Sequence, residues 1–530
     1  MAESLDSLFH RFEQLNDIGV ALSSERNLER LLENILLAAK KLTQADGGTL
    51  YSLTPDKRHL RFEIVRTDSL NIALGGTGGQ PITGLFHDLP LFKDDGTPNN
   101  ALVAACAANT GKTVNVPDAY AAEGFDFSGT RKFDERTGYR SRSFLTVPMK
   151  NHEGELIGVL QLLNAVDAET AAVTAFSAAD QRLAESLASQ AAVALTNRQL
   201  LQQLEDLFEA FIKLINVAID EKSPYTGGHC ERVPELTMLL AEAVNGTSDG
   251  PLADVRLTDK DLHELRIAAL LHDCGKITTP VHVVDKATKL ETIFDRIHLV
   301  DTRLEVARRE AEAAMWRAIA QGQKDRASAE AEHHTWCEKL EQDREFLRRC
   351  NVGGERMSDE DIERVRVLAT QYRWTAPDGQ PQPLLDGNEV ENLTVRAGTL
   401  TPAERDVINH HIVATINMLE QLPWPKGLEN VPEYAGGHHE RMDGKGYPKG
   451  LTREQMSWQA RMMGIADIFE ALTAHDRPYK KAMTLTQALR IMDNFKTNGH
   501  IDPDLYDVFV NKEVYKQYAQ RFLAPEQVDC

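Results

Sequence analysis

Histidines concentrate in one part of this chain. Twelve of the 17 histidines lie between residues 229 and 475, and three of these twelve belong to two short motifs. The motifs read Leu271-His272-Asp273-Cys274-Gly275-Lys276 and Gly437-His438-His439-Glu440-Arg441-Met442-Asp443-Gly444-Lys445-Gly446-Tyr447-Pro448. Because imidazole is the commonest metal ligand among side chains, these motifs indicate a metal site.

The first motif places a histidine beside a carboxylate. His272 and Asp273 follow the apolar run Ile267–Leu271, so both can reach one metal cluster from the end of a helix. A carboxylate can bridge two cations, and Lys276, one helical turn further on, can present a charge to an anion held there. By itself the pair is equally compatible with a helix-end histidine beside a capping carboxylate.

The second motif places two histidines next to each other. His438 and His439 cannot share one face of a regular helix, so we interpret them as ligands on a turn. The glycines and the proline that follow, from Gly444 to Pro448, require irregular backbone.

Together these motifs resemble the HD-GYP family, a bacterial branch of the HD metal-dependent phosphohydrolases. Its signature is HDxGK followed by HHExxDGxGYP, and the resemblance covers residues 220–290 and 398–505. It also includes Tyr225–Val233, Ile465–Thr473 and Asp476–Lys480. The resemblance implies a helical domain that holds two or three metal ions, most often iron or manganese. It further implies hydrolysis of cyclic di-GMP to pGpG, and in some members to GMP.

The resemblance also implies a set of site residues. The metal ligands are His229, His272, Asp273, His411, His438, His439 and Asp467. Asp273 is the bridging carboxylate and, with Lys276, a catalytic residue. Lys276, Arg477 and Lys480 are the cations that bind the substrate phosphate. His411 is preferred to His410 because Ile408 precedes it at the family's spacing.

Three departures from the family pattern refine these expectations. Three-metal members have Glu where this chain has Tyr225, so we expect two divalent ions, iron or manganese. Ligands without thiolate sulfur suit these metals. Arg477 follows Asp467 at one residue more than usual, and about 110 extra residues, roughly 289–398, separate HDxGK from His411.

Two other functions fit the same motifs. The domain could be a non-catalytic receptor for a cyclic dinucleotide, or it could hydrolyse a different cyclic dinucleotide. The intact ligand set favours an enzyme over a receptor, whereas no residue that would read the bases is recognisable.

Other residues in the motifs receive structural interpretations. Glu440 is expected to orient a ligand histidine, Cys274 to pack as a small apolar residue, and Tyr447 to shape the loop. The pair His333-His334 is expected on a solvated surface.

The N-terminal part must fold separately. Residues 1–45 have helical periodicity, and the β-rich runs that follow are Gly48–Leu53, Leu60–Arg66, Thr113–Val116, Ser143–Met149 and Leu156–Leu163. We predict a hairpin at Asn151–Gly154 and a capping box at Ser177–Asp180. The fold class is therefore an α+β domain, an antiparallel sheet with flanking helices, followed by an all-α domain.

This N-terminal part resembles a GAF domain over residues 23–197. The resemblance rests on Ser143–Met149, Gly154, Ile157–Leu162, Asn164, Phe176 and Asp180. The Lys and Glu typical of members that bind cyclic nucleotides are replaced by Ala165 and Gln181. The domain therefore either binds an unknown ligand or serves as a dimerising scaffold with an empty pocket.

A helix without Gly or Pro follows this domain. Its apolar stripe comprises Leu200, Leu201, Leu204, Leu207, Phe208 and Phe211. Such a helix either pairs with its twin in a homodimer or is simply the first helix of the next domain. The expected organisation is a GAF-like domain at 1–197, a connecting helix at 198–222, and an HD-GYP domain at 223–530 with the insertion at about 289–398. Within the insertion, 301–350 reads as solvated helices broken at Gln321–Gln323, and 374–398 reads as loop.

Composition narrows the possible partners. The 530 residues include 59 basic and 80 acidic side chains, a formal net charge of −21. An acidic chain is a poor ligand for a nucleic acid polymer or a membrane surface. The six scattered cysteines, the acidic start Met1–Asp6 and the absence of a long apolar run favour a cytoplasmic protein.

Overall fold

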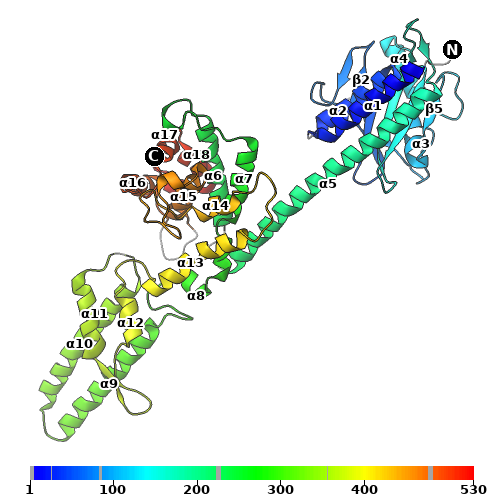
Figure 1. The fold of residues 1–530 in the computed structure, drawn as a ribbon. Coiled ribbons are helices and arrows are strands. Elements are labelled where there is room, and N and C mark those ends of the chain that lie inside the picture. The colour runs from blue at the N-terminus through cyan, green and yellow to red at the C-terminus, as the bar shows by residue number, and fades with distance from the viewer. Residues whose placement is uncertain (1–4, 26, 83–85, 223–227, 355, 476–481) are drawn as a thin grey trace. The chain divides into compact units, whose positions relative to one another are not determined.

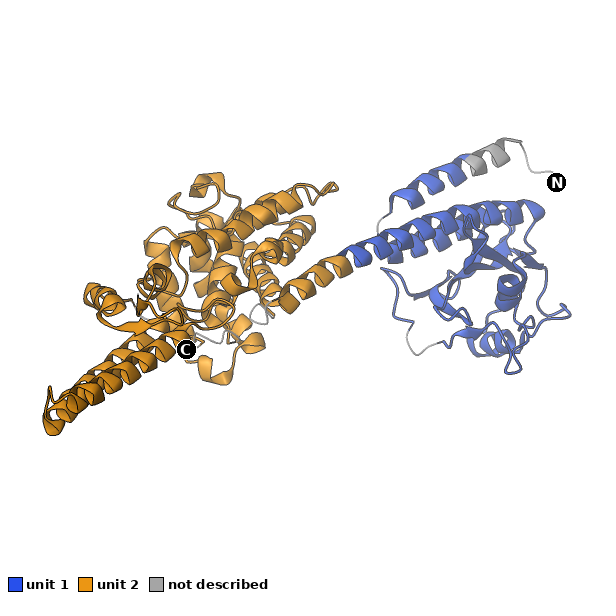
Figure 2. Cartoon of the chain, turned by 90° about the horizontal axis from the view of Figure 1, so that it is seen from below, with its two compact units in different colours: residues 1–208 blue, residues 209–530 orange. Residues whose placement is uncertain are grey.

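A computed structural model divides the chain into two compact units, residues 1–208 and residues 209–530 (Figure 2). It describes the whole chain except residues 1–4, 26, 83–85, 223–227, 355 and 476–481. The first unit is built on an antiparallel sheet with flanking helices and the second is helical (Figure 1). The predicted fold class is therefore confirmed, apart from one small strand pair described below.

The first unit is organised by an eight-stranded antiparallel sheet. Its strands are β1 (Ala45–Leu53), β2 (His59–Thr67), β3 (Ile72–Leu74), β4 (Leu89–Pro90), β5 (Val114–Val116), β6 (Phe144–Lys150), β7 (Leu156–Val166) and β8 (Val173–Thr174). The main order is β3-β2-β1-β7-β6-β5, with β4 on β2 and β8 on β7. The five predicted β-rich runs correspond to β1, β2, β5, β6 and β7. The three others, β3, β4 and β8, contain only two or three residues and were not recognised in the sequence.

Helices cover both faces of this sheet. They are α1 (Leu5–Ser24), α2 (Leu28–Thr43), α3 (Val103–Thr110), α4 (Ser128–Thr137) and the start of α5 (Ala178–Lys222). α1, α2 and α5 share one apolar core with the sheet, and α3 packs on the other side. The expected single helical stretch over 1–45 is two helices, because Asn27 caps a new one by accepting from the Arg30 N–H at 2.9 Å.

The predicted turn and cap of this unit are confirmed. The Asn151 N–H donates to Glu155 O, and Gly154 has a φ of 81°, so the hairpin between β6 and β7 closes there. The Ser177 hydroxyl and the Asp180 carboxylate bond reciprocally to each other's backbone N–H. They start α5, which continues for 45 residues without a break.

The second unit, apart from its insertion, is a set of helices joined by turns and loops, the longest of which spans residues 437–457. The helices are α6 (His229–Asn245), α7 (Asp259–Leu271), α8 (Val281–Val284), α13 (Pro402–Leu419), α14 (Val431–Gly436), α15 (Trp458–Thr473), α16 (Leu485–Thr497), α17 (Pro503–Asn511) and α18 (Val514–Phe522). The 3₁₀ turns are η1 (Gly250–Leu252), η2 (Cys274–Thr278), η3 (Arg453–Gln455) and η4 (Pro525–Gln527). Thr401 and Glu404 form the capping box that starts α13, and the similar pattern at Thr452 starts only the 3₁₀ turn η3.

Residues 289–398, which we expect to be an insertion, fold as a small subdomain. It comprises α9 (Ile297–Ala320), α10 (Arg326–Asn351), α11 (Asp359–Gln371), β9 (Arg373–Thr375), β10 (Pro381–Pro383) and α12 (Gly387–Leu393). α9 and α10 lie side by side (Figure 1). The predicted break at 321–323 falls between them, and His334 is exposed whereas His333 is half-buried.

Two expectations for the insertion are wrong. The large apolar residues of 301–350 are few, but four of them are buried in one core that α9 and α10 share with α11: Leu304, Leu340, Phe346 and Leu347. Their spacing brings them to one side of each helix, so a low apolar content does not make the helices wholly solvated. The supposed loop at 374–398 contains β10 and α12.

None of the helices in the described part of the chain combines the length with the apolar character that crossing a membrane requires.

The buried core of the insertion predicts two different outcomes for two deletions. Replacing 314–331, the tip of the α9–α10 hairpin, with a short turn removes none of the four core residues and should lower the melting temperature by only a few degrees. Deleting 301–350 removes all four, each of which stabilises the fold by roughly 2–5 kcal/mol. Amide exchange should then rise throughout α11. Equal exchange in both variants would contradict a shared core.

Candidate metal centre

The seven predicted ligand side chains lie in one cluster. Three overlapping groups place their ligand atoms within 4.8 Å of one another: His411 with His438 and His439, His229 with His272 and Asp467, and His272 with Asp273 and His438. They come from five places in the fold: the first residue of α6, the end of α7, the middle of α13, the turn after α14, and α15. Five of the seven are buried, and His439 and Asp467 are half-buried.

Asp273 lies between two sets of histidines. Its Oδ2 is 3.1 Å from His229 Nε2 and 3.2 Å from His272 Nε2. Its Oδ1 is 3.3 Å from His411 Nε2. The two oxygens of one carboxylate thus face different groups, which is the arrangement that a bridging ligand requires.

Local backbone orients three of the imidazoles in the same way. Each has its Nδ1 within hydrogen-bond distance of the carbonyl oxygen three residues earlier. These contacts are His272 to Ala269 (2.7 Å), His411 to Ile408 (2.5 Å) and His438 to Ala435 (2.7 Å). A carbonyl can only accept, so Nδ1 donates in each contact and Nε2 is the ring nitrogen that faces the cluster.

A carboxylate orients the fourth imidazole. Glu470 Oε2 lies 2.5 Å from His229 Nδ1, and Glu470 Oε1 accepts from Arg232 Nε at 2.8 Å. Glu470 is fully buried. Sequence reasoning missed this partner. Its signal was its position three residues after Asp467, on the same face of α15.

Two buried atoms of the cluster that lack hydrogen-bond partners within the described part of the chain indicate a metal site. His438 Nε2 and Asp273 Oδ1 are both buried, and neither has a hydrogen-bond partner among the residues that the structure describes. Such atoms are costly to bury unpaired, and a cation between them supplies the missing partner for both. The donor set is imidazole nitrogen and carboxylate oxygen, which suits a divalent ion.

The electrostatics of the cluster also favour cation binding. Burial favours neutral Asp273, but Lys276 and His272 outweigh it and hold the pKa of this carboxyl well below its usual range. Burial lowers the pKa of His438 well below its usual range and that of His439 to about 4, so both are neutral at pH 7, as ligands must be.

His229 differs from His438 and His439. Burial opposes its charged form, but Glu470 and Asp273 raise the pKa of His229 well above its usual range. In the absence of a cation this imidazole therefore holds an extra proton at pH 7. Because a ligand nitrogen must be unprotonated, cation binding here releases that proton.

The predicted substrate cations are only partly described. Lys276 Nζ lies 2.5 Å from Asp273 Oδ2, and its side chain is 20% exposed at the rim of the cluster. Arg477 and Lys480 fall outside the described residues, as does Tyr225.

Close backbone packing fixes α13 beside the Asp273 segment. The Gly275 N–H donates to Thr415 Oγ1 at 2.9 Å. A Cβ on Gly275 would lie 2.0 Å from His411 O and 2.6 Å from Thr415 N, so only glycine permits this approach.

One of the interpretations made from the motifs is wrong. Glu440 does not orient a histidine: its carboxylate accepts the backbone N–H groups of Lys449, Gly450 and Leu451 at 2.7, 3.2 and 2.8 Å. It therefore holds the loop that follows. Tyr447 shapes this loop as expected, and its ring also stacks on His439, with centroids 4.9 Å apart. Cys274 is buried, as expected.

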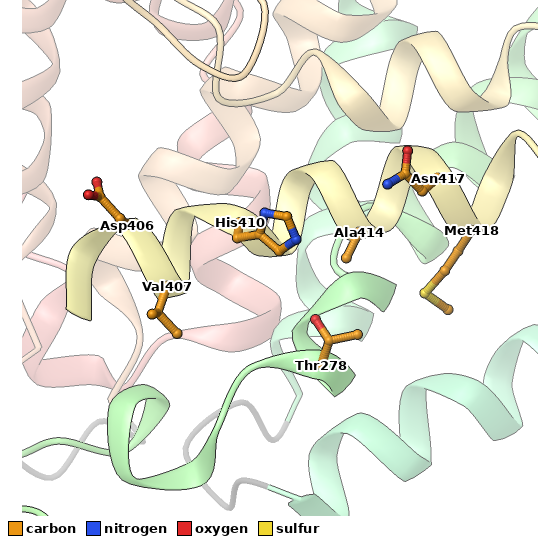
Figure 3. A pocket seen from close by; sticks show the side chains of 7 residues that line it. All are labelled: Thr278, Asp406, Val407, His410, Ala414, Asn417 and Met418. Carbon is orange, nitrogen blue, oxygen red and sulfur yellow. The ribbon is translucent and has the colours of Figure 1, made fainter. Parts of the chain in front are cut away.

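His410 lies away from the cluster. It is exposed and lines a separate shallow groove of about 590 Å³. Val407, Ala414 and Met418 point from α13 into this groove, towards Thr278 (Figure 3). The register that favours His411 over His410 therefore agrees with the structure.

The tight contact at Gly275 predicts the effect of a single methyl group. Gly275→Ala should displace α13 from η2, because the new atom meets backbone rather than a flexible side chain. We expect a loss of about 1–3 kcal/mol in the free energy of unfolding and a lower metal content in elemental analysis. Gly387→Ala is the matched control, because a Cβ there meets nothing within 4 Å. Normal stability and metal content for Gly275→Ala would contradict this packing.

Comparison with known families agrees with this architecture. A GAF domain model matches residues 27–195, and two HD domain models match residues 226–367 and 387–505. The resemblances inferred from the motifs are therefore confirmed for both domains.

Curated relatives match parts of the chain. A 3′3′-cGAMP-specific phosphodiesterase 1 of Vibrio cholerae is 35% identical over 134 residues, 25% of this chain and 30% of the relative. A cyclic di-GMP phosphodiesterase of Pseudomonas aeruginosa is 39% identical over 115 residues, 22% of this chain and 27% of the relative. A 3′3′-cGAMP-specific phosphodiesterase 3 of Vibrio cholerae is 25% identical over 319 residues, 60% of this chain and 42% of the relative.

The chain thus spans between 27% and 42% of the length of these relatives. Taken with the family matches, the motifs and the fold, the chain combines an N-terminal GAF domain with an HD domain that holds a candidate divalent-metal site.

Proposed function

We propose that this chain is a metal-dependent phosphodiesterase that hydrolyses cyclic di-GMP to pGpG. The observation that carries the proposal is Asp273, whose two carboxylate oxygens face separate histidine groups at 3.1–3.3 Å. The names of the relatives support cyclic dinucleotides as the substrate class.

The proposed cofactor is a pair of divalent ions, iron or manganese. His229, His272 and Asp467 would hold one ion, His411, His438 and His439 would hold the other, and Asp273 would serve both. When bound, such a pair lowers the pKa of water and neutralises the charge of a phosphodiester.

The chain's own residues then bind and orient the substrate. Lys276 Nζ is held by Asp273 at 2.5 Å, so its ammonium is already at the point where the anionic phosphate arrives. Arg477 and Lys480 are proposed to assist it. Because the net charge of the chain is −21, local cations must supply the attraction for a dianionic substrate. Glu470 keeps the His229 ring in place throughout.

An assay on the purified full chain tests this proposal. Anaerobically prepared protein, loaded with Fe(II) or Mn(II), is incubated with cyclic di-GMP, 3′3′-cGAMP and cyclic di-AMP, and the products are separated by chromatography. We expect a linear dinucleotide from cyclic di-GMP, and loss of both turnover and metal in Asp273→Ala. A preference for 3′3′-cGAMP would show that this dinucleotide, and not cyclic di-GMP, is the substrate. Binding without turnover at full metal loading would establish the receptor function instead.

A second prediction separates metal binding from substrate binding. Lys276→Met should retain two metal ions per chain but lose roughly 10²–10³-fold in kcat/KM, because the lost charge acts on the substrate phosphate and not on the metal. Lys260→Met removes an exposed lysine from α7 and is the matched control. Loss of metal in Lys276→Met would show that this lysine is structural.

We also propose that the GAF domain regulates the enzyme through a cavity of about 540 Å³ on the α3 side of its sheet. Aromatic side chains line it, among them Tyr51, Phe62, Phe127 and Phe144. None of the described residues that line it is Lys, Arg or His, and Asp126 accepts the Ser128 N–H at 2.8 Å. This lining favours an uncharged aromatic ligand over a cyclic nucleotide, whose phosphate needs a cation.

We further propose that the chain is a homodimer that pairs through α5. Five apolar residues on this helix are spaced alternately by four and three: Leu200, Leu204, Leu207, Phe211 and Leu214. Their exposed fractions in the single chain are 53%, 62%, 53%, 55% and 61%. This is the spacing of a coiled-coil seam, which an identical helix covers best.

The seam predicts the oligomeric state. Leu204→Glu with Phe211→Glu should convert the dimer to a monomer in light scattering and should change the specific activity. Gln202→Glu with Lys213→Glu adds acidic charge to the same helix outside the seam and should leave the dimer intact. A monomeric wild-type protein would contradict the pairing and favour α5 as a rigid spacer.

A further inference from the structure

The chain segment that carries Asp273 runs along one face of the helix that carries His411. Three contacts fix its register on α13. They join Asp273 to His411 (3.3 Å), Gly275 to Thr415 (2.9 Å) and Lys286 to Glu404 (2.7 and 2.8 Å). Glu404, His411 and Thr415 are seven and four residues apart, so they lie on the same face of α13.

The third contact involves a buried ammonium. The Lys286 side chain has no exposed surface, and its Nζ donates to both carboxylate oxygens of Glu404. Glu404 also closes the capping box of α13 by accepting the Thr401 N–H at 2.9 Å. Lys286 therefore holds the first turn of the helix on which His411 lies.

The insertion supplies the remaining partner of this ammonium. Asn392, on α12, accepts from Lys286 Nζ at 2.6 Å and is itself 2% exposed. Its own amide donates to Asn388 O at 2.8 Å, which directs the carbonyl oxygen of its side chain at Lys286. The insertion thus contacts the metal-centre scaffold through a specific polar group.

A second buried lysine strengthens the same junction. Lys289 Nζ donates to Leu393 O at 3.1 Å and to Val395 O at 2.7 Å. The Thr399 hydroxyl donates to Lys286 O at 2.9 Å. The chain entering the insertion is therefore bonded to the chain leaving it, directly before α13 begins.

We propose that Lys286 is a positioning residue for His411 and that the insertion, through Asn392, holds Lys286 in place. The inference rests on the proposed role of His411 as a metal ligand. Without Asn392 the buried ammonium lacks one hydrogen bond, the grip on Glu404 loosens, and the first half of α13 moves more freely. The insertion then contributes to metal affinity although none of its described residues is among the candidate ligands.

Variants of the full chain test this role. Asn392→Leu removes the acceptor at nearly constant volume, and Asn392→Asp restores one. Lys286→Met and Lys286→Arg form a second pair, in case the Asn392 variants do not fold. Glu391→Leu, on the exposed side of α12, is the matched control. Mn(II) affinity is measured by competition with a chelator, and amide exchange over residues 402–411 is measured on the metal-free protein.

We expect Asn392→Leu to weaken Mn(II) binding at one of two sites by roughly 10-fold and to raise exchange in the first half of α13. Asn392→Asp and Glu391→Leu should resemble the wild type. Wild-type affinity in both Asn392→Leu and Lys286→Met would overturn the proposal, as would an equal rise in exchange over the whole second unit. Substrate is absent from these measurements, so a failure of hydrolysis would contradict the proposed function alone.

Discussion

A carboxylate that is 2% exposed keeps its charge only where positive or proton-donating groups surround it, and Asp273 meets that condition from several directions. Lys276 approaches one oxygen, and His229 and His272 approach the same oxygen from α6 and α7. His411 approaches the other oxygen from α13. Three helices of the second unit, α6, α7 and α13, converge on this one group, so their packing and the chemistry of the cluster cannot be separated.

The fold meets this constraint with contacts that leave little freedom. Gly275 lets α13 approach closely enough for His411 to face Asp273, and backbone carbonyls hold three imidazoles with Nε2 directed inwards. Glu470 does the same for His229. A metal centre of this kind depends on residues that never touch an ion, because each ligand needs a second group that fixes its orientation.

The candidate ligands could be predicted because their residue types and spacing are themselves the chemical signal. The pairs His272-Asp273 and His438-His439 indicate a metal site from the sequence alone, and helical register favours His411 over His410. Glu470 was not recognised as a partner, because a carboxylate on an apolar helix looks the same whether it meets His229 or solvent. Glu440 was wrongly assigned to a histidine because it follows His439 in the sequence. Its actual partners, the backbone N–H groups of residues 449–451, lie nine to eleven positions further on.

Some parts of the fold could likewise be predicted from local sequence, and others could not. Strands such as β1 and β7 are long β-rich runs bounded by turn residues, whereas β3 and β8 contain only three and two residues. In the insertion, Phe346 and Leu347 are surrounded by charged residues in the sequence, so their common core with α11 appears only when the helices are packed. The contact between Asn392 and Lys286 spans 106 positions, and no local pattern encodes it.

The proposed role of Asp273 requires that two cations share one centre. Electron paramagnetic resonance of the metal-free full chain titrated with Mn(II) tests it most directly. We expect two Mn(II) ions per chain at saturation, with a spectrum dominated by the exchange-coupled signal of a bridged pair. A saturated protein that shows only the six-line signal of isolated Mn(II), at one ion or at two uncoupled ions per chain, would contradict this role.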